Sequence, residues 1–493
     1  MKRLRKRTEG ESLERLSPRW RARLQEWAWL GLFVLGLVAL NALQFSRTPR
    51  LTASFLLPRE VLAHLMILGT LITAVYYYSR IRVPAIWQRL RWALFTVGVI
   101  LTVALLDKII AVFSVVYSIS SLSYAVPAAF GAASMGLFFG AGAGFMTNIV
   151  VSVLVSLGAP LAPVDFLIAF GGGLIGLFSV LHLSKISDLA FGGVGIGLMN
   201  IALYLAGTTL EKAPIDLWAF LWAGLGGLVS ALLTLASIPI AEWATQRTSP
   251  LGLVQLLNPS HPLLAMLREK APGTYHHSCN VADLGESAAQ AIGADPLLTK
   301  VGGYFHDIGK LERPEFFMEN QRDGINPHDE LVPNMSKMIL SAHIKKGLEL
   351  GREFGLNEDV LQFILEHHGT SVIRYFYVKA LQSGNKDCVI SIDDYRYDSQ
   401  PPQTRETAII MLADSVEAAS RTADNGARLE SLVEEAIRDR LNDGQLSQAP
   451  LTMADIEKLK LAFCETLHAM KHTRAEAYPK LEPKRPSWWT RTV

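Results

Sequence analysis

Cysteine and charge are both scarce in this chain of 493 residues. The three cysteines, Cys279, Cys388 and Cys464, are far apart, so the sequence offers no disulfide framework and fits a reducing compartment. Charged residues make up 19% of the chain, against about 25% in typical soluble domains, and 50% of residues are hydrophobic. A portion within a membrane is therefore expected. The net charge of +2 is too small to indicate a nucleic-acid binder, so we predict no DNA or RNA partner.

The composition changes near residue 245, from closely spaced apolar runs to amphipathic patterns of ordinary charge density. We predict a transmembrane domain over residues 27–245 and a soluble domain over residues 250–480, which is long enough to bury its own core. The first 26 residues form a basic segment, and residues 1–25 of it hold nine Lys or Arg against three Glu. Residues 481–493 form a tail of basic residues and Trp that either meets anionic lipid headgroups or is disordered.

Eight apolar stretches approach the ~20 residues that a helix needs to span a bilayer. Their approximate bounds are 27–45, 61–79, 92–118, 124–140, 142–159, 165–183, 191–208 and 217–240. The third stretch contains Asp107 and Lys108, which either mark an ion path or simply pair with each other near the end of a span. Glycine-rich patches near residues 140 and 171 indicate close helix packing.

The basic loops predict the orientation in the membrane. The N-terminal segment and the arginine-rich loop at residues 80–91 should be cytoplasmic, and an even number of spans returns the soluble domain to the same side. Three arginines in the short first outside loop, residues 46–60, oppose this assignment. The first span lacks a short n-region and a cleavage site, which favours an uncleaved anchor. We expect a multi-pass protein of the cell membrane with a cytoplasmic C-terminal domain.

The soluble half shows helical patterns with little alternation, so we predict an all-α domain. Within it, the segment GGYFHDIGK, residues 302–310, places three polar groups in an apolar helical pattern. Burying such groups costs several kcal/mol each unless they are paired, hydrogen-bonded or bound to a metal. Other histidines and carboxylates in similar surroundings are candidate partners, and the full set is His276, His277, His306, Asp307, His343, His367, His368 and Asp414.

These residue types favour a metal site. A lone histidine usually lies in a core or on a surface, but five separate positions in one domain are harder to explain in that way. Imidazole and carboxylate ligands suit Mn, Fe or Zn, and one carboxylate can bridge two cations. Two cations about 4 Å apart can polarise a phosphate and activate water at neutral pH.

Three further residues have either a role at such a site or an ordinary structural one. Lys310 follows Asp307 by three positions, so on a continuing helix it could neutralise a phosphate oxygen; the alternative is a solvated helix end. Glu417 and Arg421 follow Asp414 at helical spacing and could orient a ligand from behind, or they could form a plain surface ion pair.

The order H…HD…H…HH…D resembles the HD phosphohydrolase superfamily. Longer sequence motifs show a closer resemblance to one family within it, the seven-transmembrane HD family, whose characterised members, of the PgpH type, hydrolyse cyclic di-AMP. These motifs are APGTYHHS, GGYFHDIGKLERPEFFMENQ, NPHDEL, EHHGT, YFYVKA and ETAIIMLADSVEAASR, and they fall within residues 250–480. The resemblance implies a polytopic helical membrane domain followed by a cytoplasmic α-helical HD domain. This chain departs from the family in lacking a large extracellular domain after the first span and in the segment DYRYDSQPPQTRE, residues 394–406.

The resemblance also implies a set of metal ligands. One cation would be held by His277, His306, Asp307 and Asp414, and the other by Asp307, His343, His367 and His368, with Asp307 as the bridge. It implies two divalent ions, manganese or iron, and a catalytic role for Asp307 and Lys310. Glu417 and Arg421 would support the ligands, and His276 would pack nearby or support them.

The implied reaction is hydrolysis of cyclic di-AMP to linear pApA by attack of activated water on phosphorus, which lowers the level of a second messenger. The first alternative is an HD phosphodiesterase for another nucleotide such as cyclic di-GMP, although His368 is followed by Gly-Thr and the Gly-Tyr-Pro word of that type is missing. The second is a membrane receptor whose HD domain only binds nucleotide. Substrate contacts are unknown; the words at residues 319–321 and 326–331 are either a substrate loop or ordinary turns. A homo-oligomer is left open.

Overall fold

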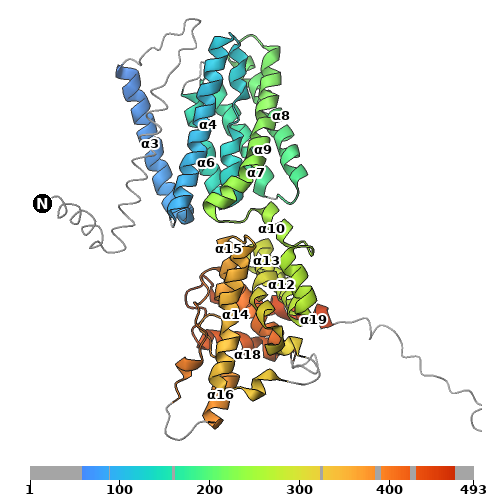
Figure 1. Ribbon diagram of the computed structural model, residues 1–493. Helices are drawn as coiled ribbons and strands as arrows, with labels where there is room; N and C mark the ends of the chain where they lie inside the picture. Colours follow the sequence, from blue (N-terminus) through green and yellow to red (C-terminus); the bar gives the residue numbers. More distant parts are fainter. Residues whose placement is uncertain are drawn as a thin grey trace, which may run out of the picture. The chain divides into compact units, whose positions relative to one another are not determined.

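The computed structural model describes residues 58–471, except for residues 88 and 182 and the segments 158–161, 322–325, 384–389 and 422–428. The chain divides into two compact units, Met1–Gly252 and Leu253–Val493 (Figure 1). The described residues form helices and contain no strand, only one isolated bridge between Val372 and Arg396. This confirms the all-α prediction. The expected basic segment 1–26, the first span and the tail 481–493 lie outside the described residues.

The first unit is a bundle of apolar helices. They are α3 (Pro58–Arg82), α4 (Leu90–Val116), α5 (Ala129–Phe139), α6 (Ala141–Ser156), α7 (Ala162–Leu181), α8 (Ile186–Leu210) and α9 (Leu217–Thr245), with the 3-10 helices η1 (Pro84–Trp87) and η2 (Ser120–Ala125). Among the described residues, five segments are long and apolar enough to cross a bilayer: Leu90–Val116, Ser120–Phe139, Pro163–Leu181, Ile186–Leu210 and Leu217–Thr245. The chain is therefore a multi-pass membrane protein.

The expected span at 142–159 differs from the structure, because its helix α6 has only 16 residues. The expected span at 124–140 corresponds to Ser120–Phe139, in which η2 is followed by the 11-residue α5. Gly140, at φ +80°, turns the chain between α5 and α6. Gly144 of α6 packs directly on the backbone of α5 at Ala132 and Gly136, which confirms that the glycines near 140 serve helix packing.

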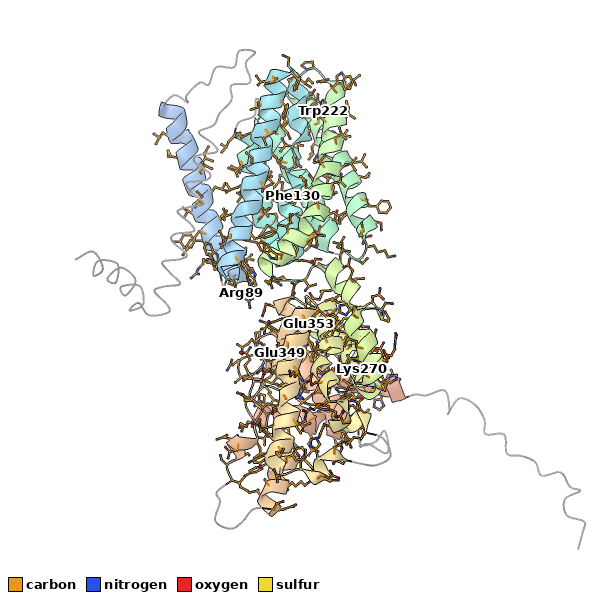
Figure 2. All side chains as sticks on the ribbon, viewed as in Figure 1. Arg89, Phe130, Trp222, Lys270, Glu349 and Glu353 are labelled. Carbon is orange, nitrogen blue, oxygen red and sulfur yellow. The ribbon has the colours of Figure 1, made fainter. Side chains whose placement is uncertain are left out.

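Two polar side chains inside this unit show how such groups are paired. Asp107 is buried in α4, and Lys108 Nζ lies 3.5 Å from its Oδ2, as the pairing alternative predicts. Asn148 Nδ2 donates to the carbonyl of Phe170, where α6 meets α7. Phe130, labelled in Figure 2, is buried among the helices.

The loop between α3 and α4 lies at the same end of the bundle as the end of α9. Trp92 Nε1 donates to the carbonyl of Thr245 at 2.7 Å. The guanidinium groups of Arg89 and Arg247 lie over the Trp92 ring, 5.2 and 5.4 Å from its centre. The predicted basic loop and the point where the chain leaves the membrane unit are therefore on one side.

The second unit is built from helices, several of which begin with Pro and some of which have a capping side chain. They are α10 (Pro250–Leu256), which crosses the division, α11 (Pro262–Lys270), α12 (Pro272–Ile292), α13 (Pro296–Phe305), α14 (Pro333–Glu353), α15 (Glu358–Glu366), α16 (Arg374–Ser383), α17 (Arg405–Ser420), α18 (Leu429–Asn442) and α19 (Met453–Lys471), with 3-10 helices η3 (Ile308–Glu312), η4 (Pro314–Phe316), η5 (Met318–Asn320), η6 (Pro327–Glu330) and η7 (Ile392–Tyr395). Asp295 caps α13 by accepting from Leu298 N, and Thr404 caps α17 by accepting from Thr407 N.

Two hydrophobic clusters hold the helices that carry the candidate metal ligands. One gathers side chains of α12, α17, α18 and α19, and the other those of α11, α13 and α15. Helix α15 joins them, because Phe363 lies in the first cluster and Ile364 in the second. A fully buried side chain of this kind contributes about 1.5–3 kcal/mol. Phe305, likewise fully buried, immediately precedes His306. The apolar residues thus fix the ends of the helices from which the candidate ligands project.

Candidate metal centre

The structure brings all seven proposed metal ligands together from five parts of the second unit. His277 is on α12, His306 and Asp307 follow α13, His343 is on α14, His367 and His368 follow α15, and Asp414 is on α17. All are buried except His368, which is partly exposed. The two glycines of GGYFHD permit this approach, since a Cβ at Gly302 would collide with the Phe363 ring and one at Gly303 with the backbone of Ala282.

Asp307 lies at the centre of the cluster, and its two oxygens face different histidines. Oδ2 lies 3.5 Å from His277 Nε2 and 3.3 Å from His306 Nε2. Oδ1 lies 3.5 Å from both His343 Nε2 and His367 Nε2. The carboxylate therefore divides the histidines into two pairs, one for each oxygen.

Four of the histidines are oriented by a hydrogen bond at Nδ1. His306, His343 and His367 each donate to the carbonyl three residues earlier, that of Gly303, Leu340 and Ile364 respectively. His277 instead faces Glu417 Oε2, 2.8 Å from its Nδ1. With the proton on Nδ1, the rings of His306, His343 and His367 turn the lone pair of Nε2 toward Asp307, and His277 turns its Nε2 the same way.

Several of the polar atoms that converge on Asp307 have no hydrogen-bond partner. His277 Nε2, His306 Nε2 and Asp307 Oδ1 are buried without a hydrogen-bond partner. His343 Nε2 and His367 Nε2 lie 3.2 Å apart, although Nδ1 is the donor on both rings. Facing lone pairs repel each other unless a cation lies between them, so this donor set fits divalent metal ions.

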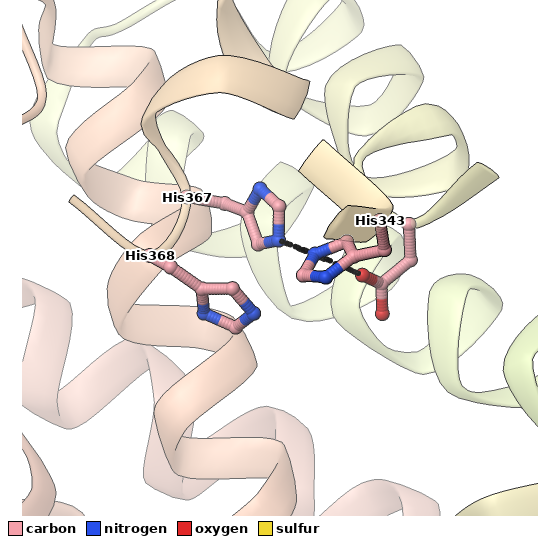
Figure 3. Close-up of side chains that lie close together, drawn as sticks. His343, His367 and His368 are labelled. Carbon is pink, nitrogen blue, oxygen red and sulfur yellow. Dashed lines mark hydrogen bonds and ion pairs between the residues drawn. The ribbon is translucent and has the colours of Figure 1, made fainter. Parts of the chain in front are cut away.

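Two overlapping groups have ligand atoms within 4.8 Å of one another. One comprises Asp307, His343, His367 and His368, and the other His277, His306 and Asp307. The imidazoles of the first group gather around one space in Figure 3. Asp414 joins the second group through Oδ1, 3.1 Å from His277 Nε2, while its Oδ2 lies 3.6 Å from His368 Nδ1.

The charges of the cluster follow from burial and pairing. Burial raises the pKa of Asp307, but Lys310 and the neighbouring histidines outweigh it and hold that pKa well below its usual value, so Asp307 is a carboxylate. Burial lowers the pKa of His343 to about 4, so this imidazole is neutral at pH 7. Burial also lowers the pKa of His277, but the carboxylates of Asp414 and Glu417 raise it to about 9, so without a metal ion this ring also carries a proton on Nε2, which a bound ion would replace.

Lys310 is not a solvated helix end. The α-helix stops at Phe305, and Lys310 lies in η3, where it is only 9% exposed. Its Nζ lies 2.6 Å from Asp307 Oδ2 and 2.8 Å from Glu319 Oε1. Burial lowers the pKa of Lys310, but the two carboxylates raise it well above the usual value, so the ammonium charge is retained.

Glu417 and Arg421 act together behind His277. Glu417 is 4% exposed, so the surface ion-pair alternative is wrong for it. Its second oxygen accepts from Arg421 Nε at 3.1 Å and from Asn280 Nδ2 at 3.3 Å. The carboxylate that orients His277 is therefore itself held in place.

The segment 319–321, suggested as part of a substrate loop, is hydrogen-bonded to other residues of the same unit. Glu319 accepts from Thr274 Oγ1 as well as from Lys310, and Asn320 Oδ1 accepts from Thr274 N. These contacts fasten the loop to the first turn of α12, which carries His277. His276 is exposed, so the expectation that it packs or supports the ligands is wrong.

Two further residues lie at the site. Glu319, within the segment 319–321 that the sequence marks as a possible substrate loop, pairs with Lys310. The Tyr397 ring stacks on His368, and the sequence pattern does not reveal it, because Tyr397 lies outside the helices, where helical spacing gives no signal.

Comparison with known families agrees with this architecture. Residues 59–249 match the family model described as 7TM receptor with intracellular HD hydrolase, and residues 274–419 match the HD domain. The two matches together correspond to both parts of the seven-transmembrane HD-domain family, the membrane region and the HD hydrolase domain. It is 32% identical over 433 residues to the cyclic-di-AMP phosphodiesterase PgpH of Bacillus subtilis, an alignment that covers 85% of this chain and 60% of that protein.

Relatives from Listeria monocytogenes match over shorter regions. Its cyclic-di-AMP phosphodiesterase PgpH is 39% identical over 302 residues, which are 60% of this chain and 42% of that protein. The crystal structure of that enzyme's HD domain in complex with cyclic-di-AMP is 44% identical, covers 43% of this chain and 99% of the other, and gives a TM-score of 0.42. The chain thus spans less than two thirds of the length of the Bacillus and Listeria enzymes.

Proposed function

We propose that this chain is a membrane-anchored, metal-dependent phosphodiesterase that hydrolyses cyclic di-AMP to linear pApA and so lowers the level of this second messenger. The observation that carries the proposal is the set of four histidine Nε2 atoms turned toward the two oxygens of Asp307. The names of the Bacillus and Listeria relatives support cyclic di-AMP as the substrate.

Two divalent ions, manganese or iron, would have separate places in this cluster. His277, His306 and Asp414 would hold one, and His343, His367 and His368 the other, with Asp307 shared between them. When bound, such ions supply Lewis-acid polarisation of the phosphodiester and lower the pKa of water.

The chain's own residues would orient the reacting groups and balance their charge. Asp307 stays ionised and presents one oxygen to each histidine pair. Lys310 supplies a fixed positive charge next to Asp307, where it can stabilise a phosphate oxygen. In the net reaction, water adds to one phosphorus and one P–O bond of the ring breaks, which leaves a linear dinucleotide with a free hydroxyl.

We place the HD unit in the cytoplasm and the protein in the cell membrane. The arginine-rich loop before α4 and the end of α9 lie on the same side of the bundle, since Trp92 contacts both Thr245 and Arg247. Basic loops are retained in the cytoplasm, so the chain leaves α9 on that side. The number of spans does not affect this assignment.

The test is a nucleotide panel on the full-length chain in detergent micelles, with metal analysis of the same sample. We expect cyclic di-AMP to be cleaved to pApA well ahead of cyclic di-GMP, by protein that holds two ions per chain. A preference for cyclic di-GMP would favour the alternative phosphodiesterase. Tight binding of nucleotide without turnover, in metal-loaded protein, would favour a receptor.

A further inference from the structure

His368 differs from the other four clustered histidines in how its ring is held. His277, His306, His343 and His367 each have an acceptor within hydrogen-bonding distance of Nδ1. Within the described residues His368 has none, because the nearest carboxylate oxygen, Oδ2 of Asp414, lies 3.6 Å from its Nδ1. A metal ligand without such a partner needs another means of fixing its ring.

Aromatic stacking supplies that means. The Tyr397 ring lies almost parallel to the His368 ring, with centroids 4.3 Å apart and planes inclined by 19°. The His367 ring, 4.1 Å away and tilted by 43°, also contacts His368. His368 therefore packs against a ligand and against a tyrosine that the proposed function does not use.

Tyr397 is held firmly in this position. Its backbone N donates to the carbonyl of Ser371, and the neighbouring Arg396 donates to the carbonyl of Thr370 at 2.8 Å. Arg396 also pairs with Asp443 at 3.1 Å. The turn that follows His368 and the segment that carries Tyr397 thus form one unit.

The same turn is fastened from a second direction. Gln445 Oε1 accepts from Thr370 N at 2.9 Å, and Gln445 Nε2 donates to Asp443 Oδ2 at 2.9 Å. Gly369, at φ +53°, lies so close to Gln445 that a Cβ would collide with its amide. Both rings of the stack are therefore set by the same hydrogen-bond network.

We propose that Tyr397 is a positioning residue, whose ring holds the imidazole of His368 in the orientation that binds the metal shared with His343 and His367. The inference rests on the proposed dinuclear site. It assigns the role to the face of the aromatic ring and not to the hydroxyl, because the stacked face is what contacts His368.

The experiment compares Tyr397→Phe, which keeps the ring, with Tyr397→Leu, which removes it, in the full-length chain. Tyr375→Leu is the matched control, since Tyr375 is 62% exposed on α16 of the same unit. Bound Mn²⁺ is measured per chain by elemental analysis and by titration followed with electron paramagnetic resonance. Loss of an orienting partner weakens metal binding by about 10–100-fold. We expect Tyr397→Leu to show this loss at one of two sites, and Tyr397→Phe and the control to retain both ions.

The metal readout separates this inference from the proposed function. Unchanged affinity for both ions in Tyr397→Leu would overturn the inference, as would loss of an ion in Tyr397→Phe or a wild-type chain that holds only one. If Tyr397→Leu aggregates, Tyr397→Gln carries the same expectation, and the result for Tyr397→Phe still decides whether the hydroxyl matters. A wild-type chain that binds two ions but cleaves no cyclic di-AMP would refute the proposed function alone.

Discussion

Substitution of Glu417 tests directly whether a hydrogen bond at Nδ1 orients a histidine for metal binding. Glu417→Ala removes the acceptor that lies 2.8 Å from His277 Nδ1, and no second acceptor among the described residues bonds to that atom. A buried donor left without its partner costs about 1–3 kcal/mol. At about 1.4 kcal/mol per factor of ten, this corresponds to ~10–100-fold weaker binding of the ion held by His277, the range known for lost supporting partners.

Two controls separate this effect from a general loss of charge. Arg421→Ala leaves the Glu417 contact with His277 intact and removes a side chain that is 36% exposed, so we expect less than about a threefold change. Glu434→Ala removes an exposed carboxylate that pairs with Lys460 and should have no effect.

The assay strips the full-length protein of metal and measures Mn²⁺ bound at increasing free Mn²⁺, together with the rate of cyclic di-AMP hydrolysis. The half-saturating Mn²⁺ concentration should rise in Glu417→Ala at one of the two sites. If it is unchanged, or if Arg421→Ala shifts it equally, the idea that Glu417 orients His277 is wrong.

Three further changes test other parts of the site. Asp307→Ala should abolish retention of both ions and reduce turnover by on the order of 100-fold or more, while the protein still fractionates with membranes; unchanged hydrolysis would remove Asp307 as the shared ligand. Lys310→Ala leaves the buried carboxylates of Glu319 and Asp307 without the ammonium group that pairs with them. The soluble unit of the metal-free chain should therefore lose about 3–5 kcal/mol of free energy of unfolding, measured by chemical denaturation. A change below ~1 kcal/mol would contradict the buried pairing. Gly369→Ala should be more destabilising than Gly444→Ala in the same measurement. Both glycines have positive φ, which costs an alanine about 1–2 kcal/mol, but only at Gly369 would the new Cβ also collide with Gln445. Equal effects of the two substitutions would contradict the packing against Gln445.

The sequence predicts the helices and the cluster where local pattern and chemistry coincide. His306 and Asp307 follow an apolar helical pattern, and Asp414 lies within another, so the sequence alone indicates that their burial must be compensated. The pairing of Asp107 with Lys108 is likewise an alternative that their adjacency suggests, and the structure bears it out.

Other features depend on contacts between distant residues. The Nδ1 acceptors of the histidines are mostly carbonyls, which every residue carries, so sequence gives no sign of them. Lys310 is buried because the chain leaves the α-helix at Phe305 and Glu319 folds back on it. Tyr397 reaches His368 through a single bridge between two irregular segments, where no periodicity marks the position.

The break between α5 and α6 has a similar origin. A continuous apolar composition on both sides of Gly140 predicts two spans of ordinary length. The structure has a membrane-length segment on one side, Ser120–Phe139, made of η2 and the 11-residue α5, but only the 16-residue α6 on the other. The lengths of buried helices are set by their neighbours, which composition does not record.

The most direct measurement is the number of metal ions per chain and the nucleotide that the same sample cleaves. Purified full-length protein loaded with manganese or iron should hold two ions and convert cyclic di-AMP to pApA much faster than it cleaves cyclic di-GMP. Protein that folds, binds no divalent metal under these conditions and leaves cyclic di-AMP intact would contradict the assignment of both the metal centre and the reaction.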